Sequence, residues 1–104
     1  MNIKILVVEP NKQPYIKEIK NNIAPIYGLV YFPFEILELE ENIILISSMG
    51  ARESKDKCFV ANRIYNDKII YSNFVILGKQ KEQFTSLSNE QIKKYTDMFK
   101  KEVF

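Results

Sequence analysis

Short apolar runs of strand length follow one another along this chain, and only its C-terminal end carries a pattern long enough for a full helix. Runs of strands closed by a helix are typical of α+β folds with a mostly antiparallel sheet. The chain has 104 residues and no internal repeat or linker, which fits one domain over residues 1–104. We therefore expect a single α+β domain in which the C-terminal helix covers the sheet.

Several segments have the composition of strands. Ile3–Val8 is β-branched and almost continuously apolar, which predicts a central strand buried on both faces. Tyr15–Ile19 alternates imperfectly, and a strand is favoured there over the start of a helix. Ile69–Leu77 alternates clearly, and Gly78 is expected to end that strand. The other expected strand segments are Leu29–Phe34, Ile43–Ser47 and a short edge segment, Cys58–Val60.

The sharpest local signal belongs to the C-terminal helix. The Ser88 hydroxyl can accept a hydrogen bond from the Gln91 amide while the Gln91 side chain reaches back, which is a capping box. Apolar residues then recur at helical spacing, so we expect a helix over about residues 89–102, packed on one face of the sheet. This apolar stripe consists of Ile92, Tyr95, Phe99 and Val103.

A second, short helix is expected near residues 21–27. Asn21 or Asn22 can cap its start, and Gly28 can end it. Pro25 keeps this helix short unless the proline lies in the first turn.

Cysteine usage and hydropathy predict the cellular compartment. Cys58 is the only cysteine, so no disulfide can form within the chain, and a reducing compartment is expected. Residues 1–8 lack the features of a signal peptide, and no apolar stretch approaches the roughly 20 residues that span a bilayer. We therefore expect a cytoplasmic protein without a membrane partner.

The residue types that support most catalysis are scarce. The chain has no histidine, which removes the commonest general base and the commonest metal ligand. Its three glycines are isolated, so no glycine-rich phosphate loop is present. A cation site could use the carboxylates of the segment 35–41, but a solvated acidic segment explains them more simply. The carboxylates of that segment are Glu35, Glu38, Glu40 and Glu41. We therefore expect a protein that is not an enzyme and that has no metal or cofactor.

Asn62 and Arg63 form the most informative polar pair. An arginine held beside a sheet can bind a phosphate or carboxylate with two hydrogen bonds. The alternative is a structural arginine that bridges to a buried acid or to loop carbonyls. A bound nucleotide would also need a ring for its base, and the candidates are Tyr65 and Tyr71. Arginine and aromatic side chains also anchor protein interfaces, and two more candidates of these types are Arg52 and Tyr15.

A set of short sequence stretches spans nearly the whole chain in order. They are Lys4-Ile-Leu-Val-Val-Glu-Pro10, Pro14-Tyr15, Lys17-Glu-Ile19, Val30-Tyr31, Pro33-Phe34, Asn62-Arg63, Ile70-Tyr71, Phe74-Val-Ile-Leu-Gly78, and Phe84-Thr-Ser-Leu-Ser-Asn-Glu-Gln-Ile-Lys-Lys-Tyr95 with Met98-Phe99. In these stretches, and most specifically in the last, from Phe84 to Phe99, the chain resembles a family of small proteins of unassigned function found in bacteriophages, plasmids and integrated elements of low-GC bacteria.

This resemblance implies an accessory protein of a mobile element. Small phage proteins without enzymatic activity often act against host defence, as anti-CRISPR proteins do. They cap a defence protein or sequester its nucleotide signal, and both actions need only a rigid surface. We therefore expect the partner to be a host defence protein or an immune signalling nucleotide. A nucleotide-sequestering protein of this size is expected to form a homo-oligomer that encloses the ligand.

Two other hypotheses about function are compatible with the sequence. A small nucleic-acid-binding module could use the lysines of the C-terminal helix, although an Asp97–Lys101 pair at i,i+4 spacing is a simpler role for one of them. Nucleic acid is therefore not the expected partner. An enzyme would have to use Cys58 or the carboxylates. The lysines in question are Lys93, Lys94, Lys100 and Lys101.

Overall fold

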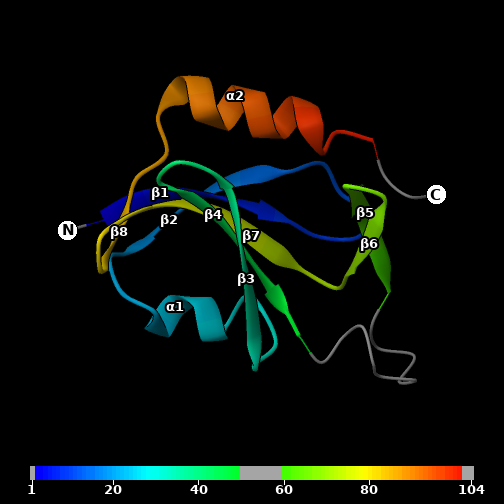
Figure 1. Ribbon diagram of the computed structural model, residues 1–104, viewed down its shortest axis with the longest axis horizontal. Coiled ribbons are helices and arrows are strands. Elements are labelled where there is room, and N and C mark those ends of the chain that lie inside the picture. Colours follow the sequence, from blue (N-terminus) through cyan, green and yellow to red (C-terminus); the bar gives the residue numbers. More distant parts are fainter. Residues whose placement is uncertain (1, 50–59, 102–104) are drawn as a thin grey trace.

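An antiparallel sheet forms the centre of the molecule, and the strands follow the order β2-β1-β7-β4-β3, with β8 paired to β7 (Figure 1). The computed structural model describes residues 2–49 and 60–101. The strands of this sheet are β1 (Asn2–Val8), β2 (Tyr15–Lys20), β3 (Phe34–Glu40), β4 (Ile43–Ser48), β7 (Phe74–Gln80) and β8 (Gln83–Thr85). Every neighbouring pair in the sheet is antiparallel, which confirms the predicted α+β class.

The three middle strands are buried on both faces because their sequences are apolar at consecutive positions. In β1, Leu6 and Val8 point into one apolar cluster, whereas Ile5 and Val7 point into another on the opposite face. Strands β4 and β7 contribute alternating side chains to the same two clusters. The predicted central strand is thus confirmed, as are β2 and β4.

One helix covers each face of the sheet (Figure 1). The short helix α1 (Ala24–Tyr27) buries Ile26 in the cluster around Ile5. Pro25 lies in its first turn, where a missing amide hydrogen costs nothing, and Gly28 follows its end as expected. The helix begins later than residue 21 because Asn22 uses its side-chain oxygen to accept a hydrogen bond from the Ala24 amide, at 2.9 Å.

The long helix α2 (Asn89–Met98) covers the other face of the sheet. Its capping box is confirmed, with the Gln91 amide 3.2 Å from the Ser88 hydroxyl and the Ser88 amide 2.8 Å from the Gln91 side chain. The helix ends earlier than residue 102, because the Phe99 carbonyl accepts a hydrogen bond from the Arg63 side chain. Ile92, Tyr95 and Phe99 are buried against the sheet as the stripe predicts, while Val103 lies outside the described residues.

A separate two-stranded hairpin corrects one sequence-based expectation. It consists of β5 (Ala61–Tyr65) and β6 (Lys68–Tyr71), joined through Asn66 and Asp67, which both have positive φ angles. A single strand over Ile69–Leu77 is wrong. The chain turns at Ser72, whose φ is 62°, so that β6 pairs with β5 while β7 enters the central sheet.

Two further expectations are corrected near the other turns. A strand over Leu29–Phe34 is wrong, because the Leu29 and Val30 amides bond back to the Ile26 carbonyl and β3 begins only at Phe34. Gly78 does not end a strand, since β7 continues to Gln80 and pairs with β8. Cys58, which opens the expected edge segment Cys58–Val60, lies outside the described residues.

Candidate binding surfaces

Asn62 and Arg63 lie at an irregularity in β5, where the pairing register shifts between Ala61 and Arg63. Neighbouring residues of a regular strand point to opposite faces, whereas both of these side chains are buried in the molecule. The Asn62 amide nitrogen donates to the Val8 carbonyl at 3.0 Å and to the Ser72 carbonyl at 2.8 Å. Asn62 therefore ties the hairpin to the end of β1 and to the turn that leads into β7.

The Arg63 guanidinium is only 1% exposed and binds main-chain carbonyls of two distant segments. Its Nε donates to the Phe99 carbonyl at 2.6 Å, and its Nη2 donates to the Lys12 carbonyl at 2.5 Å. Its Nη1 donates to the Asn62 carbonyl at 3.1 Å and to Asn62 Oδ1 at 2.7 Å. We call this arrangement the Asn62–Arg63 clasp. It joins the hairpin, the β1–β2 turn and the end of α2.

The other predicted contact residues do not meet in one pocket with the clasp. Tyr65 packs its ring 6.1 Å from that of Phe99, and Tyr71 ends β6 opposite Ala61. Tyr15 lies in β2 with Lys12 Nζ 5.2 Å from its ring centre. The pKa of Tyr15 is raised to about 12, mainly by burial and to a smaller extent by a hydrogen bond to Glu9. Arg52 lies outside the described residues.

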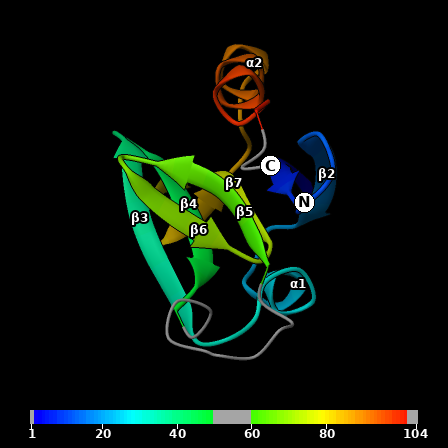
Figure 2. The ribbon, with the colours of Figure 1, turned by 90° about the vertical axis from the view of Figure 1, so that its right-hand side faces the viewer.

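A pocket of about 140 Å³ lies between the β3–β4 pair and the β5–β6 hairpin. Figure 2 shows the hairpin beside these two strands. We call this the hairpin pocket. Tyr65 is the one predicted contact residue that lines it, and the sequence gives no local signal for it because its walls come from distant segments. Its apolar lining is Leu37, Leu45, Tyr65 and Ile70, and its polar lining is Glu35, Ser47, Asn66 and Lys68.

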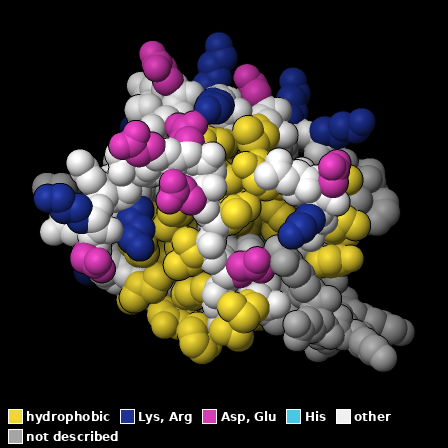
Figure 3. Space-filling model, viewed as in Figure 1, with side chains coloured by type: hydrophobic (Ala, Val, Ile, Leu, Met, Phe, Trp, Pro, Cys, Tyr) yellow, Lys and Arg dark blue, Asp and Glu magenta, His cyan; other side chains and the backbone are white. Residues whose placement is uncertain are grey.

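Three rings, those of Tyr27, Phe32 and Phe34, contact one another at the start of β3. Their centroids lie 5.7 Å apart for Tyr27 and Phe32, 5.1 Å for Tyr27 and Phe34, and 5.5 Å for Phe32 and Phe34. Phe32 is 66% exposed and Tyr27 is also exposed, whereas Phe34 is half-buried against the apolar cluster on the α1 side of the sheet. We call the three rings the aromatic patch. In Figure 3, apolar side chains gather over α1 and the nearby end of β3.

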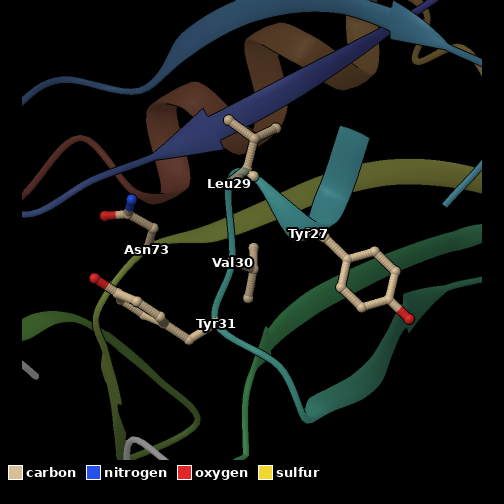
Figure 4. A pocket seen from close by; sticks show the side chains of 6 residues that line it. Tyr27, Leu29, Val30, Tyr31 and Asn73 are labelled. Atoms are coloured by element: carbon tan, nitrogen blue, oxygen red, sulfur yellow. The ribbon is translucent and has the colours of Figure 1, made fainter. Parts of the chain in front are cut away.

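A shallower pocket, also of about 140 Å³, lies beside the aromatic patch, along the segment that follows α1. Figure 4 shows Tyr31 beside Asn73, while the ring of Tyr27 points away from them. The rings of Tyr27 and Tyr31 therefore do not face each other across the pocket. The pocket lacks a pair of rings between which a base could stack. Its lining residues are Tyr27, Gly28, Leu29, Val30, Tyr31 and Asn73.

The carboxylates of β3 and the lysines of α2 meet at one point. Lys94 Nζ lies 2.5 Å from Glu40 Oε2. A hydrogen bond from Lys94 and a smaller effect of a hydrogen bond from Tyr95 lower the pKa of Glu40. Burial, with a smaller effect of the contact with Glu40, raises the pKa of Tyr95. Lys94 is thus engaged within the protein, which reduces the exposed charge available for nucleic acid. Within residues 2–49 and 60–101, no three His, Cys, Asp or Glu side chains are grouped to hold a metal ion.

The protein is an α+β domain that contains the internal Asn62–Arg63 clasp and carries the aromatic patch on its surface. The chain belongs to the family described as Domain of unknown function (DUF3846), which it matches over residues 3–100. No curated protein and no solved structure matches the chain. In the part of the chain that the structure describes, no helix is long and apolar enough to cross a membrane.

Proposed function

We propose that this protein is a non-enzymatic accessory protein of a bacteriophage or other mobile element, and that it inhibits a bacterial defence system by binding a defence protein. The mobile-element setting rests on the sequence resemblance described above. The binding role rests on the surface of the molecule, and above all on the aromatic patch. The site of binding is accordingly placed at Tyr27, Phe32 and Phe34.

The aromatic patch supports this proposal because exposed rings in mutual contact are typical of interface anchors. Aromatic residues are enriched at protein interfaces and are over-represented among the residues that dominate binding energy. Each buries roughly 150–250 Å² when covered. Phe32 is 66% exposed in the isolated chain, so a partner would cover much apolar surface there.

Sequestration of a nucleotide signal is the weaker version of the proposal. That version needs Asn62 and Arg63 to face a phosphate, whereas both side chains are buried and bind main-chain carbonyls of the protein itself. A ligand would have to replace these hydrogen bonds, which are strong when one partner is charged. The internal bonds therefore favour a protein partner.

The first test is inhibition of defence in cells. The protein is expressed in bacteria that carry one defence system at a time, and phage plaquing is counted. We expect plaquing to be restored against one system, and Phe32→Ser to lower that restoration at least about tenfold, since loss of an anchor residue costs about 2 kcal/mol. Met98→Ser is the matched control, because Met98 is also an exposed apolar residue, at 45%, and lies on α2. Equal loss in both variants would contradict the proposal.

The second test separates the two versions. Purified protein is mixed with cyclic di- and oligonucleotides, and the nucleotide in the filtrate is measured before and after heating. We expect all nucleotide to pass into the filtrate. Depletion followed by release of intact nucleotide on heating would favour sequestration and would contradict a protein partner.

A further inference from the structure

Strand β3 is the last strand of the central sheet, and among the described residues it pairs only with β4. Its pairing is regular from Phe34 to Glu38 and becomes irregular between Glu38 and Glu40. An edge strand presents a row of main-chain hydrogen-bonding groups that can template another strand. The regular part of β3 is about as long as an ordinary strand in a folded protein.

Apolar side chains are exposed on both faces of this edge. Ile36 is 55% exposed and follows Phe34 of the aromatic patch on the α1 side of the sheet. Leu37 is also exposed and lines the hairpin pocket on the other side. Successive side chains of an added strand point to alternate faces, so such a strand would reach both the aromatic patch and the hairpin pocket.

The negative charge along this edge favours a partner with positive charge. Four carboxylates occur between residues 35 and 41, and Lys94 pairs with one of them, that of Glu40. A second β3 would bring a similar set of negative charges, and like charges in paired strands are unfavourable. A segment with lysine or arginine side chains is therefore favoured over a second copy of this edge. The four carboxylates are Glu35, Glu38, Glu40 and Glu41.

We propose that β3 binds an extended, basic segment of a partner protein by strand addition, with apolar side chains of that segment covering Ile36 on one face and Leu37 on the other. This inference rests on the proposed function only in assigning the segment to a protein partner. Binding of a peptide to the pure protein is measured without any defence system, so the two proposals fail separately.

The probe is a fluorescein-labelled hexapeptide in which lysine alternates with isoleucine or valine, acetylated and amidated at its ends. Its binding is measured by fluorescence anisotropy, and its position by NMR amide shifts of the protein. We expect saturable binding, weakened by salt, with the largest shifts in β3. A peptide N-methylated at every second residue, made in both registers, should lose binding in the register whose amides face β3. A peptide with glutamate in place of lysine should not bind.

Matched variants at the two sheet edges sharpen the test. Ile36→Ser is paired with Ile16→Ser, since Ile16 is 52% exposed on the opposite edge strand, β2. Glu38→Lys is paired with Glu18→Lys in the same way, because both glutamates are exposed. Each β3 variant should raise the dissociation constant about fivefold, and each β2 variant should leave it unchanged.

Several results would overturn the proposal. These are no binding at millimolar peptide, binding that survives N-methylation in both registers, or shifts centred on β2 or α2. Self-association of the protein through β3, detected by light scattering and abolished by Ile36→Ser, would assign the edge to a second copy and would also overturn it.

Discussion

Arg63 shows how one buried side chain can hold distant segments together. Its guanidinium bonds the Phe99 carbonyl at the end of α2 and the Lys12 carbonyl in the β1–β2 turn. A planar group with five donors suits this task, whereas a lysine ammonium has three donors around one point. The two segments are far from Arg63 in sequence, so the residue type alone could not reveal which partners it has.

Arg63→Lys should therefore destabilise the protein. Carbonyls at Phe99, Lys12 and Asn62 lose charged hydrogen bonds, and a lysine cannot reach all of them. We expect the free energy of unfolding to fall by about 2–3 kcal/mol, as measured by urea denaturation. Lys93→Met removes an exposed positive charge and should change it by less than about 0.5 kcal/mol. A loss for Arg63→Lys no larger than that control would contradict the structural role of the clasp.

Gly78 is needed for the close approach of two strands. A Cβ at this position would lie 2.1 Å from Thr85 Oγ1 and 2.9 Å from the Thr85 carbonyl oxygen. Gly78→Ala should thus force β8 away from β7 and lower the free energy of unfolding by about 1–3 kcal/mol. At Gly28 the nearest atom is the Pro25 carbonyl oxygen at 3.6 Å, so Gly28→Ala should be neutral or stabilising by up to about 1 kcal/mol. Equal thermal stability of the two variants would show that the approach is not tight.

Strand β3 and helix α2 are joined by the contact of Glu40 with Lys94 and Tyr95. The contact lies where β3 leaves its regular pairing, so it fixes the end of the edge strand under the helix. Because the pKa of Glu40 is lowered in the folded state, its carboxylate stabilises the fold above the ordinary pKa of 4.5. That contribution is lost as the pH falls through the lowered pKa.

The pH dependence of Glu40→Gln tests this contact. At neutral pH the variant should be less stable than the wild type. The difference should shrink as the pH falls below 4.5, because Glu40 then takes up a proton more readily in the unfolded wild type than in the folded one. Urea denaturation at a series of pH values measures the difference, and Lys94→Met with the double variant shows whether the two residues act together. A difference that stays constant down to about pH 3 would contradict the lowered pKa.

Elements with local signals could be predicted from the sequence, whereas those set by distant contacts could not. The capping box at Ser88 and the apolar run of β1 identify α2 and the central strand because each signal lies within its own element. Strand β5 escaped prediction because Asn62 and Arg63 are polar, and only their distant carbonyl partners make burial favourable. The break at Ser72 is similarly set by the pairing of β6 with β5.

Residue type alone singles out candidate side chains but does not show where they lie in the fold. Asn62, Arg63 and Tyr65 were singled out by residue type, and the structure places the first two in the clasp and the third beside the hairpin pocket. The sequence pattern does not predict the aromatic patch, because it places Tyr27 in a helix and Phe32 and Phe34 in a strand. An aromatic-rich segment next to Pro33 was the available signal, but exposure follows only from the three-dimensional arrangement.

In the molecule as a whole, the interior and the surface hold different kinds of candidate binding groups. The Arg63 side chain makes its hydrogen bonds inside the molecule, while rings and an edge strand are presented outside. This division is consistent with the proposed binding of another protein, since the proposed contact residues lie on or next to elements that pack on the central sheet. The proposed inhibitor and the proposed strand addition both depend on that division.

The division between a structural Arg63 and a partner-binding Phe32 is tested by comparing Phe32→Ser with Arg63→Lys in their inhibition of the defence system per folded molecule. The folded fraction of each variant is taken from its denaturation curve, and inhibition is taken from plaquing. We predict that Phe32→Ser remains folded and loses inhibition, whereas Arg63→Lys keeps its inhibition per folded molecule. The opposite outcome, with Arg63→Lys inactive though folded and Phe32→Ser fully active, would contradict the account.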